Sequence, residues 1–482
     1  MQYQSTRDSR IRVSASEAIV RGLAPQSGLF VPEAFPQADL AAWKNLSYPE
    51  LAQRVLAGYL TDYQEQFLEQ ATTSTYGDAF GGKAGYTRKV HDGVYALELW
   101  HGPTCAFKDY ALQLMPKLLV EAKHNLGRTE KTRILVATSG DTGKAALAGY
   151  AGLDGIEISV FYPDAGTSEI QRLQMVTQTG ENVRVYAVEG NFDDAQTGVK
   201  RVFADASVAD ALERRDIRLS SANSINWGRL APQIVYYFYA YFRLVEQGAV
   251  AWGHPVDFCV PTGNFGDILA GYYAKRMGLP VGKLVCASNK NNVLTDFLRT
   301  GTYDARRTFY KTTSPSMDIL ISSNLERLLY HVSESCEKVA GWMKDLAETG
   351  TYTVDADTLA KIQQNFAAGY ADDMQGAAEI HDRFVQDGYL CDTHTAVAFC
   401  VAENNRSEAP MVVLSTASPF KFPRDVLAAL GEQAPESDFA AMKCLTEKTK
   451  QQAPASLCVL DSLPVRFSEK IRPEEIRAAA LR

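Results

Sequence analysis

The sequence predicts an α/β fold in which helices cover parallel sheets. Short apolar runs alternate with helical patterns from Lys131 onward, and the alternation resumes at Val256. Strands separated by helices of this length are typical of βαβ units, whose strands lie parallel in one sheet. At 482 residues the chain is too long for one ordinary hydrophobic core, so two or three domains are expected.

The predicted elements form two series. The first comprises strands at 133–138, 156–162 and 182–188, with helices at 143–151, 168–177 and 193–206. The second comprises strands at 256–261, 283–288 and 411–414, with helices at 267–277 and 292–300 and a final helical region after 423. Gly278 and Pro280 are a stop signal for the helix at 267–277.

The first 91 residues are less regular and are predicted to form a separate N-terminal segment. We therefore expect a division into residues 1–91 and 92–482, with 131–222 as the smaller α/β unit and the remainder of 92–482 as the larger one.

Composition narrows the class of protein. A net charge of -8 argues against a nucleic-acid partner, because phosphate backbones require a basic surface. The first 30 residues lack the apolar stretch of a signal peptide. The longest apolar run, 234–242, is shorter than the roughly 20 residues that span a bilayer and is predicted to be a buried helix.

The eight cysteines are scattered, which favours free thiols in a reducing compartment over disulfides or a zinc site. We expect a cytoplasmic protein without a metal or a membrane anchor.

Two glycine-rich turns each follow a predicted strand and open a helix. They are TSGDTGK at 138–144 and GNFGD at 263–267. Free N–H groups and the helix dipole make such a turn suited to an anion. The first is not a nucleotide P-loop, because Thr138 stands where a glycine is needed and Ala145 follows Lys144. Taken alone, each turn is equally well a tight βα connection that needs glycine for its backbone angles.

Lys108 lies in an apolar and small-residue segment, HGPTCAFKDY at 101–110. A partly desolvated lysine has a lowered pKa and can act as an amine nucleophile toward an aldehyde. The alternative is a lysine on a solvated helix face beside Asp109.

The segment HGPTCAFKD resembles the lysine motif of threonine synthases, which depend on pyridoxal phosphate (PLP). Five further segments, together with the opening stretch 14–36, have counterparts in the same order in that family. These are TSGDTG at 138–143, NSINWGR at 223–229, PTGNFGD at 261–267, DTHTAV at 392–397 and STASPFKFP at 415–423. The resemblance therefore spans nearly the whole chain.

The resemblance implies a fold type II PLP enzyme, similar to the tryptophan synthase beta subunit, in which two α/β units enclose the cofactor. It implies that Lys108 carries the cofactor and moves protons. The implied cofactor-binding residues are Gly263, Asn264, Phe265, Gly266 and Asp267 at the phosphate, Thr416 near the pyridine nitrogen and Asp141 near the 3′ oxygen. The implied substrate-binding residues are Ser139 and Thr142 at the carboxylate, and Asn223, Ser224 and Arg229 at the phosphate. A guanidinium binds phosphate bidentately; the alternative for Arg229 is a surface salt bridge.

The activity that the resemblance implies is conversion of O-phospho-L-homoserine and water into L-threonine and phosphate, the last step of threonine biosynthesis, by a monomer or homodimer. One alternative is another fold type II lyase, such as a threonine dehydratase or a cysteine synthase. The other is a non-catalytic relative that binds PLP or phosphorylated amino acids.

Some positions depart from the family pattern. Asp141 is Asn in some branches, and a carboxylate there disfavours negative charge on the cofactor oxygen unless it is protonated or turned away. Cys105, Gly228 and Ser418 also differ from the expected residues.

Five further polar residues are open to more than one interpretation. Asp392 and His394 are interpreted as hydrogen-bonded structural residues rather than a metal pair. His101 and Asp109 either position Lys108 or serve in packing and capping. Lys421 either reaches a phosphate or is exposed.

Overall fold

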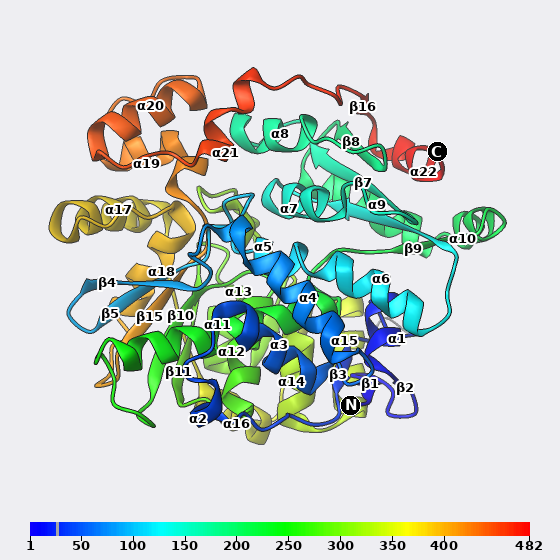
Figure 1. The fold of residues 1–482 in the computed structure, drawn as a ribbon, viewed down its shortest axis with the longest axis horizontal. Coiled ribbons are helices and arrows are strands. Elements are labelled where there is room, and N and C mark those ends of the chain that lie inside the picture. Colours follow the sequence, from blue (N-terminus) through cyan, green and yellow to red (C-terminus); the bar gives the residue numbers. More distant parts are fainter. Residues whose placement is uncertain (26–27) are drawn as a thin grey trace.

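The computed structural model describes residues 1–25 and 28–482, so Gln26 and Ser27 of the opening motif lie outside the described residues. Two sheets dominate the architecture, and Figure 1 shows them as the cores of a lower and an upper layer. The α/β class with parallel sheets is confirmed.

The larger sheet has six strands in the order β14-β11-β10-β15-β5-β4. Five run parallel, and β4 pairs antiparallel with β5 at one edge. Their bounds are β4 (Tyr86–His91), β5 (Val94–Glu98), β10 (Val256–Pro261), β11 (Val281–Ser288), β14 (Phe366–Tyr370) and β15 (Met411–Ser415). Every residue of β10 is buried, as expected for a central parallel strand covered on both faces.

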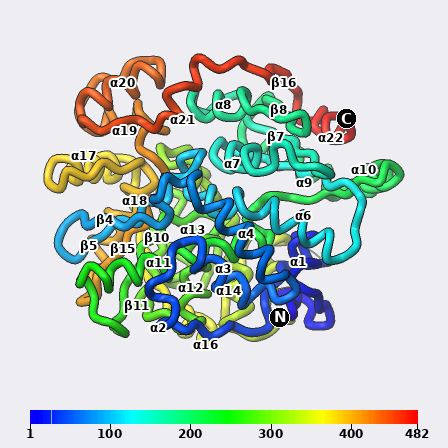
Figure 2. The backbone as a smooth tube through the Cα atoms, in the orientation of Figure 1, coloured from blue at the N-terminus to red at the C-terminus, as the bar shows by residue number. Residues whose placement is uncertain are grey.

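The smaller sheet has five parallel strands in the order β16-β8-β7-β6-β9. Their bounds are β6 (Lys131–Ala137), β7 (Ile156–Pro163), β8 (Val183–Val188), β9 (Ile217–Ser220) and β16 (Lys470–Ile471). The edge strand β16 comes from the far end of the chain, and Figure 2 shows that segment crossing back over the smaller unit beside α8 and β8.

Helices cover both sheets. Those in contact with the larger sheet include α12 (Gly266–Arg276), α13 (Val293–Thr300), α16 (Ala356–Asn365) and α18 (Thr393–Glu403). Those in contact with the smaller sheet include α7 (Asp141–Tyr150), α9 (Phe192–Ala204) and α10 (Ala206–Glu213). Other helices include α5 (Asp109–Leu112), α6 (Met115–Asn125), α8 (Glu169–Val176), α11 (Trp227–Glu246), α14 (Leu325–Ser333), α15 (Cys336–Thr349), α17 (Asp373–Asp387), α19 (Pro423–Ala429), α20 (Asp438–Thr449), α21 (Ala455–Cys458) and α22 (Ile476–Leu481).

The predicted strands and helices coincide with β6, β7, β8, β10, β11, β15, α7, α8, α9, α12 and α13 to within two residues at each end. The apolar run 234–242 lies inside α11, as predicted. Local chemistry explains two of the boundaries. The side chain of Asn191 accepts hydrogen bonds from backbone N–H groups of the first turn of α9, and Gly278, at φ 102°, follows α12.

The N-terminal segment contains a three-stranded antiparallel sheet, β2-β1-β3, and the helices α1 (Ala15–Arg21), α3 (Tyr48–Tyr59) and α4 (Glu65–Tyr76). The strands are β1 (Tyr3–Ser5), β2 (Arg12–Val13) and β3 (Phe30–Pro32). This segment packs on the rest of the chain: Asn226 Nδ2 donates to the carbonyl of Ile19 over 2.9 Å, and α3 contacts α11.

Two pairings cross the predicted domain limits. β4 lies before residue 92 yet belongs to the larger sheet, and β16 lies outside 131–222 yet belongs to the smaller one. The division into units itself stays a prediction.

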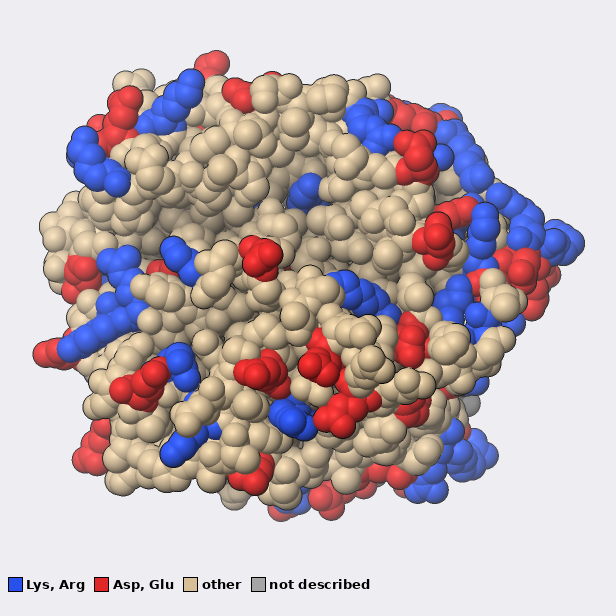
Figure 3. All heavy atoms as spheres, in the orientation of Figure 1, with Lys and Arg blue, Asp and Glu red and all other residues tan. Residues whose placement is uncertain are grey.

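Charged side chains of both signs are interspersed along the edge of the molecule near α10 and α22, while the upper middle of the same face is mostly uncharged (Figure 3). In the two described stretches of chain, no helix is both long enough and apolar enough to cross a bilayer.

Candidate active site

Lys108 lies at the start of α5, next to the end of strand β15. The backbone N–H of Phe107 donates to the carbonyl of Thr416 over 2.8 Å, and Ala106 and Ala417 form an isolated bridge. The structure therefore brings together Lys108 and Thr416, which the sequence assigns to one site. Cys105 has a φ of 61°, a backbone conformation that costs energy for a non-glycine residue and is concentrated at functional sites.

The Lys108 side chain is buried, with 9% of the residue exposed, so the alternative of a solvated lysine is wrong. Burial lowers the pKa of its ammonium group. Asp141, with Oδ2 3.6 Å from Nζ, opposes this shift, while the positive charges of Lys421 and Arg229 add to it. Lys108 is therefore a readily deprotonated amine, as a nucleophile toward an aldehyde requires.

Asp141 begins α7 at the end of β6 and is held by an ion pair. Its Oδ1 lies 2.6 Å from Nζ of Lys421 and accepts a hydrogen bond from Gln171 Nε2 over 2.9 Å. Burial alone would raise the pKa of this carboxyl, but the ammonium groups of Lys421 and Lys108 outweigh burial and hold the pKa well below its usual range. Asp141 is thus ionised and faces Lys108, so it is in neither of the two states, protonated or turned away, that would avoid disfavouring negative charge on the cofactor oxygen.

Lys421 is fully buried, so of the two alternatives for this lysine the exposed side chain is wrong. Besides Asp141, its ammonium group donates to the carbonyl of Thr104 over 3.0 Å. Asp109 binds the same turn through the N–H and hydroxyl of Thr104, at 2.8 and 2.7 Å. Asp109 therefore holds the backbone that precedes Lys108. His101 bonds to Glu98, 2.7 Å from Nε2 to Oε2.

The 263–267 loop connects β10 to α12 and forms a cradle at the helix N-terminus. Phe265 has a φ of 62°, and a Cβ placed on Gly263 would lie 2.9 Å from the carbonyl oxygen of Ser316. The carbonyl of Asn264 accepts from the N–H of Asn324 over 3.0 Å. Within the described residues, no side chain caps the N-terminus of α12, so its N–H groups are available to an anion.

The Asp267 side chain points from this loop toward α11. Its Oδ1 accepts hydrogen bonds from the hydroxyls of Tyr236 and Tyr237, at 2.5 and 3.0 Å. Burial raises the pKa of this carboxyl to about 7, although both tyrosine hydroxyls oppose the shift. A contribution of Asp267 to phosphate binding would therefore come from its backbone.

Asn223, Ser224 and Arg229 lie between β9 and the first turn of α11. Ser224 Cβ is 3.8 Å from where a Cβ on Gly266 would stand, so this segment adjoins the cradle. Arg229 is 4% exposed and donates to the carbonyl of Ala222. It forms no ion pair with a carboxylate in the part of the chain that the structure describes, and its Nε is buried without a partner there. The surface salt bridge considered for Arg229 is therefore wrong.

Burial lowers the pKa of Arg229 to about 10, which leaves it charged near neutral pH. A buried cation with an unused N–H donor is unusual and calls for an anionic partner.

The TSGDTG turn is held by its own hydroxyl groups. Thr138 Oγ1 accepts from the backbone N–H groups of Gly140 and Gly143, each over 3.0 Å. A Cβ on Gly140, which has a φ of 154°, would lie 2.6 Å from the Gln171 side chain. Ser139 and Thr142 are half-buried on this turn.

The predicted hydrogen bonding of Asp392 and His394 is confirmed. Their side chains bond to each other over 2.7 Å, and His394 Nε2 accepts from the N–H of Ser316 over 3.1 Å. Asp392 also caps α18. Through Ser316, this pair supports the loop that packs on Gly263. Residues 1–25 and 28–482 contain no group of three or more His, Cys, Asp or Glu side chains placed to hold a metal ion.

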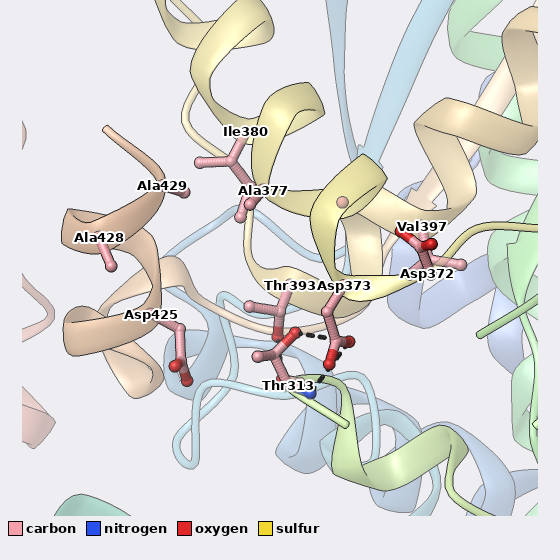
Figure 4. Close-up of a pocket in the computed structure, with 11 residues that line it drawn as sticks. Thr313, Asp372, Asp373, Ala377, Ile380, Thr393, Val397, Asp425, Ala428 and Ala429 are labelled. Atoms are coloured by element: carbon pink, nitrogen blue, oxygen red, sulfur yellow. Dashed lines mark hydrogen bonds between the residues drawn. The ribbon is translucent and has the colours of Figure 1, made fainter. Parts of the chain in front are cut away.

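A separate cavity of about 210 Å³ lies between α17, α18 and α19, with Asp373 bonded to Thr313 at its floor (Figure 4). None of its lining residues belongs to the site predicted from the sequence.

Sequence reasoning missed Gln171, Tyr236 and Tyr237. Gln171 contacts the carboxylate of Asp141, and both tyrosines contact that of Asp267. None of the three lies in one of the quoted motifs, so no local signal identifies them.

The donor set fits PLP. A buried amine with a lowered pKa suits the aldehyde, and the uncapped N-terminus of α12 with its glycine cradle suits the phosphate. The residues that would hold the cofactor are Lys108, Gly263, Asn264, Phe265, Gly266, Asp267, Thr416 and Asp141.

Family models agree with this assignment along the chain. The model described as "Threonine synthase N terminus" matches residues 2–76, "Pyridoxal-phosphate dependent enzyme" matches 84–416 and "Threonine synthase, C-terminal" matches 395–474.

Similar proteins point the same way. Human threonine synthase-like 1 is 41% identical over 442 residues, covering 88% of this chain and 59% of that protein. The chain thus spans about three fifths of the length of that relative. The threonine synthase of Pseudomonas aeruginosa is 40% identical, covering 90% of this chain and 92% of that protein. The crystal structure of PLP-bound threonine synthase from Brucella melitensis superposes with a TM-score of 0.89 at 38% identity, covering 100% of this chain and 99% of that one. The chain belongs to the threonine synthase family of fold type II, PLP-dependent enzymes.

Proposed function

We propose that this protein converts O-phospho-L-homoserine and water into L-threonine and phosphate. One observation carries the proposal: the buried amine of Lys108 lies near two separate anion positions. One is the cradle at the N-terminus of α12, whose first-turn residue Asp267 interacts with the charge of Lys108. The other is Arg229, which is buried and charged, and whose positive charge acts on Lys108. A cofactor phosphate and a substrate phosphate need two such positions.

Each residue has a distinct part in this reaction. Bound PLP supplies an electron sink for carbanion chemistry on the substrate. Lys108 Nζ takes the proton from Cα and returns it, a role that the lowered pKa of a buried amine favours. Arg229, with Asn223 and Ser224, binds the substrate phosphate and stabilises the charge that develops as phosphate leaves Cγ.

Ser139 and Thr142 bind the substrate carboxylate from the start of α7, and Thr416 is the residue that would hold the pyridine nitrogen of PLP. Thr416 and Lys108 are buried, so bulk water is kept from the reacting atoms until hydration at Cβ.

The compartment, the oligomeric state and the partners of the protein are part of the same proposal. The protein acts in the cytoplasm as a monomer or homodimer on a small molecule, without a nucleic-acid partner. An acidic net charge of -8 supports the last point, and eight free cysteines are compatible with a reducing compartment.

The test is phosphate release from O-phospho-L-homoserine by the PLP-loaded protein, with the organic product identified chromatographically in the same tube. Equal amounts of phosphate and threonine are expected. Phosphate with 2-oxobutyrate would instead indicate a lyase whose intermediate escapes hydration. A PLP-loaded protein that does not turn over would overturn the substrate assignment.

A further inference from the structure

Lys421 and Asp141 connect the two sheets inside the site. Lys421 ends a short turn, Pro419–Lys421, that follows β15 of the larger sheet, whereas Asp141 begins α7 after β6 of the smaller sheet. Lys421 is 0% exposed and Asp141 3% exposed, so water does not screen their interaction. The 2.6 Å pair is therefore a buried contact between parts of the chain far apart in sequence.

Asp141 lies between two ammonium groups but binds them unequally. Lys421 Nζ is 2.6 Å from Oδ1, within hydrogen-bond distance, while Lys108 Nζ is 3.6 Å from Oδ2. Gln171 adds a second donor to Oδ1, and the carbonyl of Thr104 accepts a further hydrogen bond from Lys421. The strong partner of Asp141 is therefore Lys421.

Other charged and titratable groups surround this cluster. They are Arg229 and Asp267 near Lys108, and Asp109, Lys144 and Cys105 near Lys421. Burial raises the pKa of both other carboxyls, Asp109 and Asp267, whereas its two lysine neighbours lower that of Asp141. Asp141 is thus the carboxylate of this cluster that is most firmly ionised.

Attachment of PLP requires the neutral form of Lys108. The nitrogen lone pair forms the bond to the aldehyde carbon, and the aldehyde oxygen leaves as water with the two amine protons. An ammonium group has no lone pair for this step. If Asp141 had no partner other than Lys108, its charge would hold Lys108 protonated, because an opposite charge favours the ionised form.

We propose that Lys421 is a positioning residue that neutralises Asp141 and so leaves Lys108 free, as an unprotonated amine, to capture the cofactor. The inference rests on the proposed role of Lys108 as the cofactor lysine, but it does not depend on the substrate.

The decisive variant is Lys421→Gln, which keeps a donor for Asp141 and removes the charge. We expect the pKa of Lys108 to rise by about one unit or more in the full-length, PLP-depleted protein. The rate of PLP capture near neutral pH would then fall about tenfold, because one pKa unit is a tenfold change in the neutral fraction. The pKa is read from the pH profile of reductive methylation at Lys108, quantified by peptide mass spectrometry, and capture from the rise of visible absorbance.

Two further variants separate electrostatics from folding. In Asp141→Asn/Lys421→Gln both charges are absent, so the pKa of Lys108 should return to the wild-type value or below it. Lys123→Gln removes another buried lysine, bonded to the carbonyl of Glu130, and should leave the profile of Lys108 unchanged.

The proposal would be overturned if the pKa of Lys108 were the same in Lys421→Gln as in wild type. It would also be overturned if that pKa rose in Asp141→Asn/Lys421→Gln as much as in Lys421→Gln alone. If Lys421→Gln does not fold, the pKa of Lys108 is measured in Lys421→Met and compared with that of the double variant, with the same expected results. Failure of the substrate test leaves these outcomes unaffected, because no substrate is present.

Discussion

The hydroxyl of Tyr236 donates a 2.5 Å hydrogen bond to Oδ1 of Asp267, which joins helix α11 to the first turn of α12 just behind the glycine cradle. Oδ2 of the same carboxyl is buried and has no partner within the described residues. An unpaired buried oxygen favours the protonated acid, because ionising it would cost more desolvation. The charge state of Asp267 is therefore linked to folding.

Asp267→Asn is expected to change the pH dependence of stability. The pKa of Asp267 is raised to about 7 in the folded protein, so the native state binds a proton more strongly than the unfolded state. Wild-type stability from this group is fully present at acidic pH and is lost as pH rises toward 7. The Asn variant has no such loss. Its free energy of unfolding should therefore rise relative to that of wild type between about pH 4 and pH 7, by at most roughly 4 kcal/mol. Its melting temperature should rise relative to wild type over the same range.

The measurement is thermal unfolding of both PLP-loaded proteins across that range. Asp154→Asn, at an exposed position after α7, is the control. A difference between Asp267→Asn and wild type that does not vary with pH would contradict the expected protonation of Asp267.

Lys108→Ala is expected to abolish the visible absorbance of attached PLP together with nearly all turnover, because Lys421, the amine that also follows β15, is held 2.6 Å from Asp141. Absorbance spectra and phosphate release measure the two effects. Lys117→Ala removes a lysine bonded to Ser74 and Thr75 and should retain both signals. Full activity in Lys108→Ala would refute the cofactor role.

Gly263→Ala is expected to weaken PLP binding about tenfold. The new Cβ would lie 2.9 Å from a backbone oxygen of Ser316, so the cradle must shift, and overpacking of this kind costs about 1–3 kcal/mol. Equilibrium dialysis gives the dissociation constant. Gly341→Ala, on α15 with no atom within 4 Å of the new Cβ, should leave PLP affinity unchanged and stabilise the helix by about 0.5–1 kcal/mol. Equal PLP affinities in Gly263→Ala and wild type would show that the cradle tolerates a side chain.

Arg229→Lys is expected to lower kcat/KM about tenfold to a hundredfold and to weaken inhibition by inorganic phosphate in parallel. A lysine loses the planar fork that binds phosphate bidentately, and a hydrogen bond to a charged group contributes about 1.5–3 kcal/mol. Steady-state kinetics with phosphate as inhibitor reports both values. Arg218→Lys, exposed on β9, is the matched control. If phosphate inhibits Arg229→Lys as well as wild type, Arg229 does not bind the substrate phosphate.

The α/β class and the buried strands were predictable because apolar runs such as VDFCVP at 256–261 leave little alternative to a covered parallel strand. Strand β16, Lys470–Ile471, was not predictable, because a two-residue strand exists only through its pairing with β8. Likewise, the motifs indicated Asp141 and Lys108 but not the state of Asp141. That state depends on Lys421, whose contact arises only when the two sheets pack together.

The late position of β16 also has a consequence for synthesis of the chain. β6, β7, β8 and β9 are complete once Ser220 has been made, but one edge of their sheet stays open until Lys470 and Ile471 emerge. An open edge with unpaired N–H and C=O groups can pair with other chains. This edge therefore stays unpaired with β16 while roughly the second half of the chain is being synthesised.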